Sequence, residues 1–286
     1  MSINKIEELR ETSTDPMFLG GNVSITDAIH FFTKAGESNP VWTAIGQHLN
    51  LIASVGIRNQ GTLAGNLMMK NAHNDFPSDV FLSMETAGAT LEIVDPNGGV
   101  EEKTVGEFAT TDMNKKFIKK IKFPSLKNKT TKKDLHKLWL TSKAKAGGAE
   151  WKIRTFKIMP RSSNAHGYVN AGFLALVDAE NNFKIEGKPT IVFGGINSTF
   201  IHARETENFL MGRNMNDHDM FIEALTILAS ELEPEFDPVL ASPIYRKQLA
   251  MGLFYKVDFK CRQHTFGNFT ICSSFSMFLE MLLLQM

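Results

Sequence analysis

The sequence predicts an α+β protein of two domains. Its first half joins helical apolar spacing to a short alternating strand and a turn, and its second half runs from strand-like segments into helical runs. With 286 residues, 43% hydrophobic and 22% charged, the chain is long enough for two cores. Strands followed by helices within one half favour an antiparallel sheet with packed helices.

Two helices are expected near the start of the chain. In residues 22–32, Ser24 is placed as an N-cap, Asp27 follows three residues later, and apolar residues recur at helical spacing. The run over residues 41–56 also places its apolar residues on one face, and we expect this second helix to break at Gly56.

A helix, a strand and a second strand complete the first half. Ser78 can cap the short helix "DVFLSMETAG", and "ATLEIVD" alternates as a half-buried strand before the turn "DPNGG". The segment "KKFIKKIKFPS" alternates lysines with apolar residues, which is typical of an edge strand protected by its charges.

The polar stretch "LKNKTTKKD" indicates a linker or an exposed loop, so the domain boundary is expected at residues 124–134. We therefore assign residues 1–124 to the first domain, 134–258 to the second and 259–286 to a divergent tail. The strands expected in the second domain are "KLWLTSK", "WKIRTFKIM", "GYVNAGFLALVD" and "KPTIVFGGIN". Its three helices are expected to begin near "ARETENFLMG", "MFIEALTILASEL" and "SPIYRKQLAMGLFYK".

Charge and cysteine content narrow the function. Lys+Arg and Asp+Glu are equal at 31 each, so no bulk charge favours nucleic acid or an acidic membrane surface. Cys261 and Cys272 are too few for a disulfide framework or a cysteine-held cluster, and the eight histidines show no ligand spacing. Without an apolar leader or a spanning segment, we expect a cytoplasmic protein with no metal site of its own.

The stretch "IRNQGTLAGNLMMKNAHNDFPSDVF" is the candidate binding segment. Gly61 and Gly65 allow close backbone approach, and successive exposed N–H groups in such a turn would favour phosphate oxygens. Asn66 can donate and accept, and Asp75 could accept from sugar hydroxyls. By spacing alone, an ordinary turn is the preferred interpretation, because neither a GxGxxG fingerprint nor a Walker loop is present.

The order of these motifs resembles a known family. "IRNQGTLAGN", the Pro-Ser-Asp corner and "TLEIVD" resemble the FAD-binding (PCMH-type) domain of the molybdenum-containing hydroxylases, the xanthine dehydrogenase and aldehyde oxidase family. The second half resembles that family's flavoprotein C-terminal domain, as in CO dehydrogenase, in the motifs "FKIMPRSSNAHGYVNAGF", "VFGGIN" and "YRKQLA". The residues of these motifs are nearest to those of insect-type aldehyde oxidase. The resemblance covers about residues 3–256.

The resemblance implies FAD as cofactor and a set of residues that contact it. A lysine carried over near the flavin ring would stabilise the negative charge of the reduced flavin. Relatives often have an aromatic residue where this chain has isoleucine before the turn. The residues carried over are Ile52, Thr62, Leu63, Ala64, Gly65, Asn66, Asp75, Ile118 and Lys157.

The resemblance further implies electron transfer from iron–sulfur clusters to FAD and on to oxygen or NAD. The implied partners are the iron–sulfur and molybdenum-cofactor domains of a parent enzyme, with a possible homodimer. An upstream "GNT" phosphate loop has no counterpart, and the tail does not align, so we expect a chain truncated at both ends. The alternative is a truncated or alternatively spliced, non-catalytic interaction partner, and flavin occupancy would separate the two.

Overall fold

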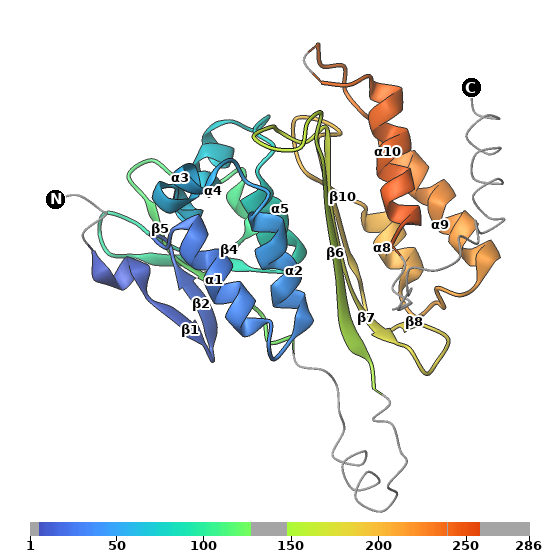
Figure 1. Ribbon diagram of the computed structural model, residues 1–286, viewed down its shortest axis with the longest axis horizontal. Helices are drawn as coiled ribbons and strands as arrows, with labels where there is room; N and C mark the ends of the chain where they lie inside the picture. Colours follow the sequence, from blue (N-terminus) through green and yellow to red (C-terminus); the bar gives the residue numbers. More distant parts are fainter. Residues whose placement is uncertain (1–5, 127–147, 239, 258–286) are drawn as a thin grey trace, which may run out of the picture.

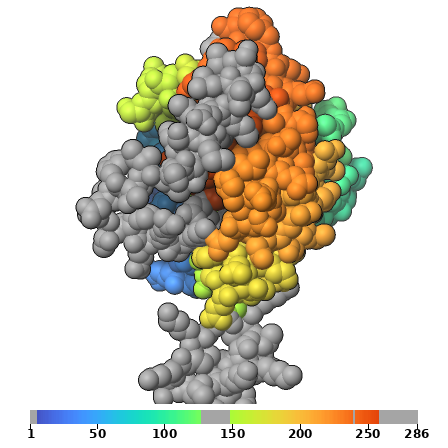
Figure 2. Space-filling model, turned by 90° about the vertical axis from the view of Figure 1, so that its right-hand side faces the viewer, coloured from blue at the N-terminus to red at the C-terminus, as the bar shows by residue number. Residues whose placement is uncertain are grey.

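Sheets and helices alternate in four layers in the computed structural model (Figure 1). The structure describes residues 6–126, 148–238 and 240–257. Helices α2 and α5 of the first half lie between the two sheets, and α8, α9 and α10 cover the far side of the second sheet, the side that faces the viewer in Figure 2. The α+β class with antiparallel sheets and packed helices is therefore confirmed.

The first sheet has five strands in the order β1-β2-β5-β3-β4, all antiparallel. The lysine-rich strand β5 lies between β2 and β3, so its predicted place at an edge is wrong. Its lysines instead pair with carboxylates of neighbouring strands, as Lys122 does with Glu92 at 2.9 Å. The bounds are β1 (Thr12–Thr14), β2 (Met17–Gly20), β3 (Thr90–Val94), β4 (Val100–Thr104) and β5 (Phe117–Lys122).

The first-half helices begin largely where the sequence indicates. Ser24 accepts from the Asp27 N–H and Ser78 from the Phe81 N–H, as expected of N-caps. The bounds are η2 (Glu7–Arg10), α1 (Ile25–Ala35), α2 (Pro40–Leu49), α3 (Val55–Gln60), α4 (Leu63–Ala72), α5 (Asp79–Thr86) and α6 (Val105–Phe108).

The helix expected to end at Gly56 is two helices. α2 ends at Leu49 and α3 begins at Val55, so Gly56 lies inside the second of them. Ala53, with φ of 41°, turns the chain between them, and the buried Arg58 donates to the Ile52 carbonyl at 2.6 Å. This bond from a guanidinium to a carbonyl six positions earlier could not be inferred from the apolar spacing.

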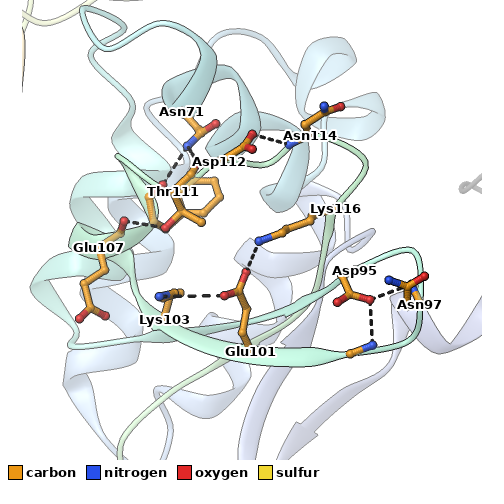
Figure 3. Close-up of polar contacts among 12 residues, drawn as sticks. Asn71, Asp95, Asn97, Glu101, Lys103, Glu107, Thr111, Asp112, Asn114 and Lys116 are labelled. Carbon is orange, nitrogen blue, oxygen red and sulfur yellow. Dashed lines mark hydrogen bonds and ion pairs between the residues drawn. The ribbon is translucent and has the colours of Figure 1, made fainter.

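The C-terminal end of α4 is tied to the segment that follows α6 (Figure 3). Asn71 donates from Nδ2 to the carbonyls of Phe108 and Thr111, at 2.8 and 2.9 Å. A capping box between Thr104 and Glu107 starts α6. These bonds hold one end of α4, and the predicted phosphate turn lies at its other end.

The second sheet has the order β10-β9-β7-β6, with β8 paired to β7. Strand β7 is buried on both faces because helices pack on each side of it. The predicted strand "KLWLTSK" lies outside the described residues. The bounds are β6 (Glu150–Ile158), β7 (Val169–Asp178), β8 (Lys184–Ile185), β9 (Thr190–Gly194), β10 (Ile201–His202), α8 (Arg204–Leu210), α9 (His218–Glu231) and α10 (Pro243–Tyr255).

One polar contact between the halves involves His202. Its Nε2 lies 2.6 Å from Glu85 Oε1 of α5, and its Nδ1 lies 3.3 Å from Glu207 Oε1 of α8. Burial alone would lower the pKa of His202, but the hydrogen bonds and charges of Glu207 and Glu85 outweigh it and raise the pKa to about 9. The imidazolium thus links the two halves.

We expect this contact to make stability depend on pH. Because the folded pKa exceeds the ordinary 6.5, its contribution is complete below about pH 6.5 and is lost as pH rises through about 9. Urea unfolding of His202→Gln should show a deficit of about 1–3 kcal/mol at acid pH that shrinks above pH 9. A deficit independent of pH would contradict the charged contact.

Candidate functional site

A cavity of about 900 Å³ opens where α3, α4 and the start of α5 meet the segment after β6. Its wall is mostly apolar, and Ile57 and Met69 are 58% and 49% exposed there. Exposed apolar side chains that line a concave surface are typical of a ligand site. The polar and charged lining residues are Ser54, Asn66, Asp79, Lys157, Arg161, Asn164, His166 and Tyr168.

A buried ion pair lies among the lining residues. Lys157 Nζ is 2.7 Å from Asp79 Oδ2, and the two side chains are only 3% and 8% exposed. Lys157 also donates to the Leu51 carbonyl at 3.2 Å, and Asn170 donates from Nδ2 to Asp79 Oδ1 at 3.0 Å. A buried ion pair of this kind needs such added hydrogen bonds to offset the loss of water.

The fold explains why these groups meet. Asp79 is the first residue of α5, where the helix dipole favours a carboxylate, and the cap Ser78 precedes it. Lys157 lies near the end of β6, directly opposite Asn170 of β7 in the sheet register. Because α5 packs on β7, the pair joins the two halves of the chain.

A histidine lies beneath the pair. His48 of α2 is 2% exposed, and its Nε2 is 3.4 Å from Asp79 Oδ1. Within the described part of the chain, neither ring nitrogen has a hydrogen-bond partner. The Asp79 carboxylate is therefore approached by groups from α2, β6 and β7.

The predicted phosphate turn is the first turn of α4, and its amides are not free. Gly65 N donates to Thr62 Oγ1 at 3.0 Å, which makes Thr62 the N-cap. The N–H groups of Leu63 and Ala64 donate to the carbonyls of Val23 and Gly21, each at 3.1 Å. The expected row of open amides is therefore wrong, because neighbouring backbone already uses them.

The structure brings Ile52, Asn66 and Lys157 together in the cavity. Asn66 also accepts from the Ser78 hydroxyl at 2.6 Å. Asp75 is exposed and lines an adjoining cavity of about 310 Å³, which shares Pro77, His166 and Leu240 with the first.

The other carried-over residues lie elsewhere. Thr62 faces a separate polar groove of about 1200 Å³, and the side chains of Leu63 and Ile118 are buried in the core. Ala64 packs against that core, and Gly65 is exposed. Because the side chains of Leu63 and Ile118 are buried, their contact with a ligand would be made through the backbone, as the resemblance implies for Ile118, and it stays a prediction.

Sequence reasoning missed Asp79 and His48. In the sequence, Asp79 follows a capping serine and looks like any residue in the first turn of a helix. His48 lies on an apolar helix face. The Pro-Ser-Asp corner is evident in the sequence, but nothing in its spacing indicates that its carboxylate reaches a lysine 78 positions away.

Two family models match the chain. Residues 1–126 match the FAD binding domain in molybdopterin dehydrogenase, and residues 154–258 match the CO dehydrogenase flavoprotein C-terminal domain. These matches define the class as a flavoprotein. The chain therefore carries two flavoprotein domains of the kind found in molybdenum hydroxylases.

Several curated relatives are plant enzymes. An indole-3-acetaldehyde oxidase and aldehyde oxidase 4, both of Arabidopsis thaliana, are each 30% identical, over 90% and 83% of this chain. The chain spans 18% and 17% of their lengths. The expected nearness to insect-type enzymes is thus not supported, since these matches are to plant aldehyde oxidases.

Solved structures share the fold. CO dehydrogenase from Oligotropha carboxidovorans superposes with a TM-score of 0.65 at 18% identity, covering 89% of this chain and 78% of that chain. Quinoline 2-oxidoreductase from Pseudomonas putida 86 gives 0.63 at 19% identity, with the same coverage. Across the residues that the structure describes, no helix combines the length and apolar character needed to cross a membrane.

Removing the lysine of the ion pair should be costly. Lys157→Met leaves the buried Asp79 carboxylate without its cation, and we expect the free energy of unfolding to fall by about 3 kcal/mol in urea titrations. Lys184→Met is the matched control, because Lys184 forms a more exposed pair with Glu186 and should lose less than about 1 kcal/mol. Equal losses of unfolding free energy in the two variants would show that the buried Asp79–Lys157 pair matters no more to stability than an exposed pair.

Proposed function

We propose that the chain binds FAD in the cavity beside Lys157 and serves as the electron-transfer portion of an aldehyde oxidase-like molybdenum hydroxylase. The observation that carries this proposal is a buried, paired lysine in an apolar cavity at the junction of two matched flavoprotein domains. The two domain matches support FAD as the cofactor, and the cavity beside Lys157 supports the position proposed for it.

The lining chemistry fits the cofactor. Ile52, Ile57 and Met69 offer an apolar wall suited to a flat ring system. Lys157 and Asn66 offer polar groups suited to the ring's oxygen and nitrogen edge. Arg161 and His166, both exposed, offer donors suited to phosphate oxygens, in place of the amides that α4 uses internally.

When bound, FAD supplies reversible two-electron chemistry, and the protein supplies binding, orientation and electrostatics. The apolar wall lines one side of the cavity. Asp79 and the Leu51 carbonyl hold Lys157 in place, and Asn170 donates to Asp79. In the proposed parent enzyme, iron–sulfur clusters deliver electrons to this site, and oxygen or NAD receives them. Asp75, in the adjoining cavity, is proposed as an additional contact for the cofactor's hydroxyl groups.

The proposed partners are the iron–sulfur and molybdenum-cofactor domains of the parent enzyme, in a cytoplasmic protein that forms a homodimer. Oxidation of the substrate would take place outside this chain, at the molybdenum centre. A second candidate, a non-catalytic chain that binds flavin weakly, is favoured by the engaged amides of α4.

An FAD titration separates these functions. The purified chain should retain a flavin absorption band after incubation with FAD and desalting. Ile57→Glu places a carboxylate on the apolar wall, and we expect the FAD dissociation constant to rise at least about tenfold.

Val100→Glu is the matched control, because Val100 on β4 is 61% exposed and lies outside the cavity. It should bind FAD as the parent does. No retained flavin in a chain shown by circular dichroism to be folded would favour the non-catalytic candidate. Equal weakening in both variants would contradict the placement of the cofactor.

A further inference from the structure

We propose that Asp79 is a positioning residue of the flavin site, whose carboxylate fixes Lys157 and cancels its charge, so that the bound flavin keeps a low reduction potential. This inference rests on the proposed function. It concerns a residue that lies in the Pro-Ser-Asp corner but is not among the cofactor contacts expected from the sequence.

The first step is the convergence of three side chains, two of them hydrogen-bond donors, on one carboxylate. Lys157 Nζ contacts Oδ2 at 2.7 Å, Asn170 Nδ2 contacts Oδ1 at 3.0 Å, and His48 Nε2 lies 3.4 Å from Oδ1. Each comes from a different element, and each of these residues is anchored in packed structure. The carboxylate is therefore held in position independently of any ligand.

The second step concerns the orientation of Lys157. A lysine ammonium sits on a flexible four-carbon stem and turns toward water unless a partner holds it. Asp79 and the Leu51 carbonyl hold Nζ so that the side chain is only 3% exposed. The lysine is thus fixed beside the cavity instead of extending into solvent.

The third step concerns charge. Two-electron reduction makes a flavin more negative at neutral pH, so a nearby uncompensated cation stabilises the reduced form. Lys157 paired to Asp79 at 2.7 Å contributes almost no net charge to its surroundings. Removing the carboxylate charge should therefore expose the ammonium to the flavin and raise its reduction potential.

A purely structural role of Asp79 predicts a different result for the double variant. If Asp79 served only the start of α5, its replacement would disturb the site in the same way whether or not Lys157 remained charged. Charge cancellation requires that a second substitution, which removes the lysine charge, restore the potential. The double variant therefore separates the two explanations.

The experiment compares the FAD-loaded chain with Asp79→Asn and with the double variant Asp79→Asn/Lys157→Gln. Spectroelectrochemistry should show that Asp79→Asn raises the equilibrium constant for two-electron reduction about tenfold, which is about 30 mV. The double variant should return to within about twofold of the parent. Asp112→Asn is the control, because this exposed carboxylate accepts a bond from the Asn114 N–H and does not line the cavity, so the potential of the flavin should not change in this variant (Figure 3).

A second readout needs no flavin. Acetic anhydride labelling followed by mass spectrometry should modify Lys157 at least about tenfold faster in Asp79→Ala than in the parent, while circular dichroism shows both to be folded. Equal labelling would overturn the positioning role.

The outcomes are distinguishable. A potential unchanged in Asp79→Asn, or shifted equally in the double variant, would overturn charge cancellation. Absence of flavin from every protein would overturn the proposed function and leave the labelling result to decide whether Asp79 positions Lys157.

Discussion

The buried ion pair between Asp79 and Lys157 is the constraint on which the site depends. It links the first turn of α5 to the end of β6, and therefore one flavoprotein domain to the other. A pair this buried is not expected to add much stability compared with apolar residues of the same size. The pair instead fixes α5 against β6 and holds the Lys157 side chain beside the cavity with its charge paired to Asp79.

The packing around α5 makes that placement possible. The helix is buried over most of its length and contacts β7 and β9 of the second sheet, so the two halves share a layer. Ile153 and Leu174 of the second sheet belong to the core of the first half. The cavity beside Lys157 is consequently part of a packed junction and is not formed by loops alone.

Much of the fold follows from local sequence signals. Serine caps at Ser24 and Ser78 and the alternation of β3 were sufficient to place their elements, since these depend on neighbouring residues. The central position of β5 was missed because its lysines find carboxylates on strands distant in sequence. The break between α2 and α3 was missed because Arg58, not glycine, organises the turn.

The candidate site was only partly predictable. The family resemblance supplied Lys157, Asn66 and Ile52, which the structure brings to one cavity, but it could not show that the α4 amides are already bonded. Asp79 was missed since its role depends on a contact across 78 positions, which no local pattern encodes.

A crystal structure of the chain grown with FAD would test the account most directly. We predict electron density for the flavin ring in the cavity lined by Ile52, Ile57 and Met69, in contact with Lys157, with the Asp79 pair intact. Flavin density in the polar groove beside Thr62, or in a different cavity altogether, would contradict it.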